Sequence, residues 1–218
     1  MMNFDLSLYL VTDRSLSLGR PLIDVVEQAV KGGVTMVQLR EKNCNSKEFY
    51  KEAYALKKLL VQYKVPLIIN DRLDIALAVD ADGLHIGQQD LPYPVARQLL
   101  GNDKIIGLSI ENKEQLHQAN QWDVDYIGLS PVFDTSTKTD TAKALGIQGV
   151  KEFTKLSKHP SIGIGGVNLT NAVDIIHAGA NGLAVVSAIM SQSNPLNAAR
   201  DLQSIIQTTK RKNNNEKV

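Results

Sequence analysis

The sequence predicts an α/β fold, a single-domain (β/α)8 barrel of the TIM type. Eight short runs of β-branched and aliphatic residues recur along the chain. These runs are apolar throughout, as expected for parallel strands that are covered on both faces. Amphipathic stretches lie between them, and eight strand–helix units are the number that closes such a barrel in roughly 200 residues or more.

The expected strands are LYLVT, TMVQL, PLIIN, GLHI, IIGLS, YIGLS, SIGIGG and GLAVVS, at residues 8–12, 35–39, 66–70, 83–86, 105–109, 126–130, 161–166 and 182–187. The clearest helical pattern covers residues 46–63, and Ser46 can cap its first turn. Its apolar positions follow the spacing of three or four residues, at Phe49, Tyr50, Ala53, Leu56 and Leu60. Further helices are expected at residues 22–33, 74–81, 169–180 and 194–209, several of which end in a GG or GA stop signal.

An open, doubly wound sheet is the competing architecture. Its phosphate-binding fingerprint, G-x-G-x-x-G, would follow the first strand, but that strand runs into TDRSLSLGR at residues 12–20. The barrel is therefore favoured. We expect one domain over residues 1–209 and a polar tail at residues 210–218, because KRKNNNEKV has no apolar anchor.

Composition excludes several classes of protein. The formal net charge of the 218 residues is +1, so no overall field attracts nucleic acid or anionic lipid, and any anion site must be built locally. No run is apolar enough for a signal sequence or a membrane span, which predicts a cytoplasmic protein. Cys44 is the single cysteine, which excludes an internal disulfide and a multi-cysteine metal site.

The polar residues that follow the predicted strands would meet at one end of the barrel, which is the working face of such folds. Strand two continues as QLREK, where Gln38, Arg40 and Lys42 occupy alternate positions and share one face. Polar residues at the ends of the later strands are Asn70, Asp71, Asp90, Ser109 and the segment DTSTKTD at residues 134–140.

Each of these residues also has a purely structural interpretation. Arg40 and Lys42 can be solvated charges, Asp71 and Asp90 can cap the helices that follow them, and the hydroxyls can belong to a polar loop. Their common location favours a site. Gly165 and Gly166, with amides near Val186 and Ser187, suit a monophosphate. The residues that suit a more highly charged group are Arg40, Lys42, Lys138 and Asn70, with Asp71 and Asp90 free to hold magnesium.

Nucleophilic catalysis has no obvious agent in this sequence. His85 lies within a predicted strand and is expected to be structural, and the other histidines fall in helices or connections. Cys44 follows EK in a loop and has no recognisable base partner.

Six motifs in order resemble those of the thiamine-phosphate synthases, a family that joins a hydroxymethylpyrimidine diphosphate to a thiazole phosphate. They are GGVTMVQLREK, LIINDRLDIAL, DGLHIGQQDLP, IIGLS, GLSPVFDTSTK and IGIGGV, within a match from YLVTD to GLAVVSAI that covers nearly the whole chain. The chain departs from many relatives at Asp134, where they have proline, and at Val186, where they often have isoleucine.

The resemblance implies a set of functional residues. Those around the pyrimidine diphosphate would be Gln38, Arg40, Glu41, Lys42, Asn70, Ser109 and Lys138, with Leu39 also counted as substrate-binding and Asp71 and Asp90 as Mg²⁺ ligands. Those around the thiazole phosphate would be Thr135, Ser136, Thr137, Gly166, and the backbone of Val186 and Ser187. Arg40, Lys42 and Lys138 would stabilise the departing diphosphate.

Two other functions remain as alternatives. Related proteins of the same fold tautomerise the thiazole phosphate, and a barrel can also serve as a non-catalytic phosphate-ligand sensor. Neither needs the diphosphate and magnesium residues, of which Asp71, Asp90 and Lys138 are present. The expected partners are small molecules, without nucleic acid or membrane, and the sequence leaves open a homo-oligomer.

Overall fold

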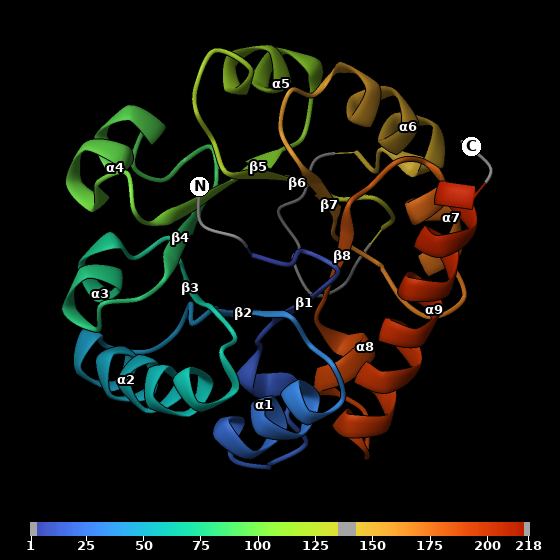
Figure 1. Ribbon diagram of the computed structural model, residues 1–218. Helices are drawn as coiled ribbons and strands as arrows, with labels where there is room; N and C mark the ends of the chain where they lie inside the picture. Colours follow the sequence, from blue (N-terminus) through green and yellow to red (C-terminus); the bar gives the residue numbers. More distant parts are fainter. Residues whose placement is uncertain (1–3, 135–142, 216–218) are drawn as a thin grey trace.

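The computed structural model describes residues 4–134 and 143–215, and these residues form a closed barrel of eight parallel strands. The strands pair in sequence order, and the last pairs with the first (Figure 1). They are β1 (Leu8–Val11), β2 (Met36–Leu39), β3 (Leu67–Asn70), β4 (Gly83–Ile86), β5 (Ile105–Ile110), β6 (Tyr126–Leu129), β7 (Ser161–Gly163) and β8 (Gly182–Val185). The predicted (β/α)8 barrel is confirmed.

The helices form a ring around the barrel (Figure 1). In chain order they are η1, a 3₁₀ turn (Arg14–Leu16), α1 (Leu22–Lys31), α2 (Ser46–Tyr63), α3 (Leu73–Ala78), α4 (Tyr93–Leu100), α5 (Lys113–Ala119), α6 (Gly146–Leu156), α7 (Ala172–His177), α8 (Ser187–Met190) and α9 (Pro195–Asn215). None of the helices formed by the described residues is long and apolar enough to cross a lipid bilayer.

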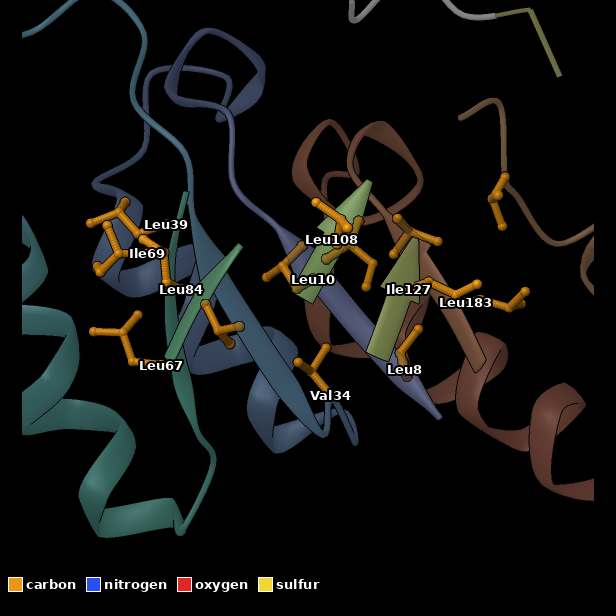
Figure 2. Packing of buried hydrophobic residues seen from close by; sticks show 14 of the residues in the cluster. Leu8, Leu10, Val34, Leu39, Leu67, Ile69, Leu84, Leu108, Ile127 and Leu183 are labelled. Carbon is orange, nitrogen blue, oxygen red and sulfur yellow. The ribbon is translucent and has the colours of Figure 1, made fainter. Parts of the chain in front are cut away.

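Apolar strands are favoured here because both of their faces are buried. Outward-facing residues such as Leu10, Leu39 and Ile69 pack between the barrel and the helices (Figure 2). Inward-facing residues fill the barrel, and Tyr9 and Met36 lie side by side in the β1–β2 register. Side chains alternate between these layers, so odd and even positions of one strand have different roles.

Helix α2 begins and ends where the pattern predicts, but its capping residue differs. Asn45, not Ser46, is the N-cap, and its side-chain oxygen accepts a hydrogen bond from the Glu48 amide at 3.0 Å. The N-cap must precede the first helical residue and takes an extended conformation, which Asn45 has at φ −75° and ψ 162°.

Helix α9 continues beyond the boundary expected at residue 209. It runs to Asn215, so the first part of the predicted tail is helical. Lys210 Nζ donates a hydrogen bond to Ser7 Oγ at 2.7 Å, which joins this part of the helix to the residue before β1. The polar sequence of this segment does not predict such a contact between distant residues.

Candidate active site

A cavity of about 270 Å³ lies at the carboxyl ends of the strands. Every strand of the barrel contributes to it, either directly or through the segment that follows. The predicted site residues that line it are Gln38, Arg40, Lys42, Asn70, Asp71, Asp90, Ser109, Gly166, Val186 and Ser187. Thr135, Ser136, Thr137 and Lys138 lie outside the described residues, as does most of the predicted phosphate loop.

The segment after β2 directs alternate side chains to opposite sides. Arg40 and Lys42 line the cavity, and the Arg40 amide is held by Thr12 Oγ1 at 3.1 Å. Leu39 is fully buried in the layer beneath the helices, and the Glu41 side chain contacts Arg14 instead. Neither Leu39 nor Glu41 is among the residues that line the cavity, because strand alternation turns them outward.

Asp71 and Asp90 do not cap helices. The N-cap positions of α3 and α4 are Arg72 and Pro92, and neither helix has a side-chain cap. Asp71 instead adopts a left-handed conformation with φ 61°, and its amide donates to the His85 carbonyl at 2.9 Å. Such conformations are uncommon outside glycine and concentrate at functional sites, which favours a role for this carboxylate in the cavity.

The two carboxyl groups have opposite pKa shifts. Burial raises the pKa of Asp71, but interactions with Asp90 and Lys42 outweigh it, so the pKa lies below its ordinary value. Burial and the neighbouring Asp71 carboxylate raise the pKa of Asp90, whose oxygen accepts from the Gly87 amide at 2.7 Å. The pair therefore concentrates negative charge that a nearby cation relieves, and Lys42 Nζ already lies 2.5 Å from Asp71.

This donor set fits a magnesium ion that shares its ligands with a substrate. Magnesium needs only one or two carboxylates when phosphate oxygens and water complete its coordination. No cluster of three or more histidine, cysteine, aspartate or glutamate side chains suitable for a metal occurs within residues 4–134 and 143–215. An ion held by protein ligands alone is therefore not supported by this part of the chain.

The opposite side of the cavity presents backbone amides. Gly165 and Gly166 have φ 96° and 65°, and a Cβ on Gly166 would lie 2.8 Å from Phe133 Cβ. Only glycine fits this turn without strain. No acceptor is found among the described residues for the amides of Gly166 and Ser187, the latter at the start of α8. Free amides in this arrangement suit a phosphate.

The chain matches a family model described as thiamine monophosphate synthase over residues 8–189. It belongs to the thiamine-phosphate synthase family. The family predicted from the sequence motifs is thereby confirmed.

Individual relatives support this assignment over nearly full lengths. The chain is 54% identical over 205 residues to the thiamine-phosphate synthase of Syntrophomonas wolfei, covering 94% of this chain and 98% of the relative. It is 52% identical over 199 residues to that of Vibrio parahaemolyticus, covering 91% and 97%. The solved structure of a thiamine phosphate pyrophosphorylase from Pyrococcus furiosus matches with a TM-score of 0.86 at 35% identity, covering 94% of this chain and 96% of that chain.

Several lining residues were not predicted from the sequence. Gln88 donates from Nε2 to the Ser109 carbonyl at 2.5 Å, and His85 contributes a wall of the cavity. The other unpredicted lining residues include Val11, Gln89, Glu111, Ser130 and Ile164. Most of them lie at the end of a strand or just after it. If every polar residue at such positions had been counted as a site residue, Gln88, Glu111 and Ser130 would have been predicted.

A second cavity, of about 1050 Å³, opens between the segment after β1, the segment after β2 and helix α2. Arg14 bridges two carboxylates there, Glu41 at 3.4 Å and Glu52. Burial, reinforced by Glu41 and opposed by Arg14, raises the pKa of Glu52 to about 7. The other charged or titratable residues that line this cavity are Asp13, Arg40, Lys42, Cys44, Glu48 and Lys51.

Proposed function

We propose that this chain is a thiamine-phosphate synthase. It would couple 4-amino-2-methyl-5-(diphosphomethyl)pyrimidine to 4-methyl-5-(2-phosphoethyl)thiazole, releasing diphosphate, and also CO₂ if the carboxythiazole is used. The observation that carries the proposal is the contact of Lys42 with Asp71 beside Asp90, in a cavity that also presents free amides. The family assignment supports the same reaction.

The chemistry requires charge stabilisation more than a protein nucleophile. Diphosphate leaves a benzylic-type carbon that the electron-rich aminopyrimidine activates, and the thiazole nitrogen attacks the resulting cation. Arg40 and Lys42 line the cavity and would stabilise the departing diphosphate. Lys138 has the same proposed role by family resemblance. The remaining rate acceleration would come from holding the two substrates close together in the orientation that the reaction needs.

Mg²⁺ is part of the proposal. Asp71 and Asp90 would hold the ion together with diphosphate oxygens. Burial and the neighbouring Asp71 carboxylate raise the pKa of Asp90, and a bound cation would oppose that rise. When bound, the ion would supply Lewis-acid stabilisation to the leaving group. Lys42 would then be free to pair with the diphosphate as well as with Asp71.

The thiazole phosphate is assigned to the other side of the cavity. The amides of Gly166 and Ser187 support this assignment because neither donates a hydrogen bond to another described residue. Val186 precedes α8 and would contribute through its backbone. Thr135, Ser136 and Thr137 are assigned to the same phosphate by family resemblance.

The two alternatives are less well supported. A tautomerase or a sensor of one phosphate would have no need for the Lys42–Asp71–Asp90 arrangement. The relatives described above are named as synthases or pyrophosphorylases. The proposal further includes a cytoplasmic enzyme whose partners are small molecules and not nucleic acid.

A coupling assay tests this function. Purified protein is mixed with both substrates and Mg²⁺, and thiamine phosphate and diphosphate are quantified, with an EDTA control. Equal, magnesium-dependent formation of both products is expected. If folded protein forms neither, the synthase proposal is wrong, and the thiazole phosphate alone is then followed for tautomerisation.

A further inference from the structure

A chain of hydrogen bonds crosses the interior of the barrel and joins two residues that line the cavity, Gln38 on β2 and Ser109 on β5. Gln38 Nε2 on β2 donates to the Tyr9 hydroxyl at 2.9 Å. The Tyr9 and Tyr126 hydroxyls lie 2.8 Å apart, and Tyr126 lies 2.9 Å from His85 Nδ1. His85 Nε2 lies 2.9 Å from Ser109 Oγ on β5. The two ends, Gln38 and Ser109, both line the cavity.

The first link favours one direction for the others, because Tyr9 has a single hydrogen to donate and the Tyr126 hydroxyl is its other hydrogen-bond partner among the described residues. Tyr9 accepts from Gln38 and therefore donates to Tyr126. In this direction Tyr126 donates to Nδ1 of His85, and His85 is then the neutral tautomer with its hydrogen on Nε2. That hydrogen is donated to Ser109.

The direction of the chain leaves a defined polar atom at each end. Gln38 keeps its amide oxygen as an acceptor beside its second N–H, and Ser109 keeps its hydroxyl hydrogen as a donor. No partner for either is found among the described residues. Reversing the chain would exchange these properties, so that Gln38 would offer N–H groups and Ser109 an oxygen lone pair.

We infer that Tyr9, Tyr126 and His85 are positioning residues that set the hydrogen-bond polarity of the pyrimidine site, with an acceptor at Gln38 and a donor at Ser109. This inference rests on the proposed function. The exocyclic amine of the aminopyrimidine would donate to Gln38, and a ring nitrogen would accept from Ser109. A pyrimidinone, with oxygen in place of the amine, has the opposite polarity and is disfavoured.

The surrounding side chains and backbone pack closely around this chain of hydrogen bonds. Tyr9 and Tyr126 are fully buried, and their rings meet edge to face with centroids 5.8 Å apart. Gly107 on β5 makes room for Tyr126, since a Cβ there would lie 2.0 Å from its Cζ atom. Burial raises the pKa of both tyrosines, which keeps the hydroxyl hydrogens that the chain needs.

The tautomer of His85 tests the inference without any activity. Nitrogen-15 NMR of the unmodified protein, above neutral pH, distinguishes the two neutral imidazole forms. We expect His85 to be a single tautomer with hydrogen on Nε2. Hydrogen on Nδ1, or a mixture of both forms, would overturn the inference. Because no turnover is measured, this result is independent of whether the synthase proposal holds.

Equilibrium binding of two probes, the aminopyrimidine diphosphate and its pyrimidinone analogue, tests the consequence for recognition. Tyr126→Phe removes one hydroxyl in the middle of the chain, and Tyr9→Phe is the second variant if the first does not fold. We expect the aminopyrimidine to bind about 10-fold more weakly, as for one or two lost hydrogen bonds, and the preference over the pyrimidinone to fall. Thiazole phosphate binding is expected to stay unchanged.

Tyr93→Phe is the matched control. Tyr93 is also buried and its hydroxyl donates to Asp123 at 2.7 Å, but it lies on α4, outside the barrel. It should retain the full preference for the aminopyrimidine. The inference is wrong if Tyr126→Phe and Tyr9→Phe keep that preference, or if Tyr93→Phe loses it equally, since the effect would then be general destabilisation.

Discussion

The ammonium group of Lys42 lies 2.5 Å from a carboxylate oxygen of Asp71, so a cation after β2 directly contacts a carboxylate after β3. Adjacent parallel strands bring these residues together, although 29 positions separate them in the sequence. Asp71 lowers the energy of a cation at this position, which makes the contact a suitable place for the diphosphate and its metal ion.

Asp71→Asn should abolish most magnesium-dependent turnover and leave the fold intact. Asparagine tolerates the left-handed backbone at this position but is a much weaker metal ligand. We expect a loss of about 100-fold at limiting Mg²⁺, measured as diphosphate release. Asp74→Asn, on exposed α3 surface where Asp74 pairs with Arg72, is the control. Unchanged turnover in Asp71→Asn would exclude its assignment as a ligand.

Gly166→Ala should weaken binding of the thiazole phosphate. The added Cβ would meet Phe133 Cβ at 2.8 Å and the Asp134 carbonyl at 3.0 Å, in a conformation with positive φ. We expect KM for the thiazole phosphate to rise about 10-fold, as one amide contact shifts, with little change for the pyrimidine diphosphate. Steady-state kinetics with each substrate varied in turn measures this difference.

Gly101→Ala is the control for that substitution. Gly101 also has positive φ, 79°, but no atom lies within 4 Å of the Cβ position. It shares the backbone strain and lacks the clash near the phosphate site. Equal rises in KM for both substrates in Gly166→Ala, or the same change in Gly101→Ala, would argue against a local phosphate site.

Glu52 should make the protein less stable as pH rises. Its pKa of about 7 in the folded state lies above the usual value, so the folded protein holds a proton that the unfolded chain releases. Stability is therefore lost between about pH 4.5 and 7, by an amount of the order of 3 kcal/mol. Thermal unfolding across this range should show a falling Tm in the native protein.

Glu52→Gln should flatten this dependence, because glutamine cannot release a proton. Glu48→Gln is the control, since Glu48 is exposed, lies on the same helix and lines the same cavity. The assignment is wrong if Glu52→Gln keeps the native slope of Tm against pH, or if Glu48→Gln flattens it to the same extent.

Gly107→Ala should destabilise the barrel interior. Its Cβ would lie 2.0 Å from Cζ of Tyr126, an atom of a rigid ring with no room to move. We expect the free energy of unfolding to fall by about 3 kcal/mol, measured by denaturant unfolding. Gly128→Ala is the comparison, since the atom nearest its Cβ is His85 Cε1 at 3.4 Å, an ordinary contact. A smaller loss at Gly107 than at Gly128 would contradict this packing argument.

Local sequence patterns were sufficient to predict most of the fold. The apolar runs located all the strands, and the spacing of Phe49, Ala53, Leu56 and Leu60 located α2 to the residue. Strand alternation also placed Arg40 and Lys42 on one face. These predictions succeeded because the spacing of buried residues in a helix or strand repeats over a few residues, so the pattern is visible in the sequence.

The Asn45 cap and the full extent of α9 were not predicted. Asn45 competes with Ser46 one position later, and only the backbone angles decide between them. Beyond residue 209, α9 makes a hydrogen bond from Lys210 to Ser7, which lie 203 positions apart. The local sequence alone therefore predicts neither the N-cap of α2 nor the end of α9.

The barrel, the family and the end of the barrel at which polar residues gather could all be predicted from the amino-acid sequence. Tertiary structure alone decided that Asp71 and Asp90 face the cavity instead of capping helices, and that Glu41 faces away from it. It also decided that His85 connects Tyr126 to Ser109. The physical reason is that hydrogen bonds and pKa shifts depend on distances between strands, which barrel closure sets and local sequence does not contain.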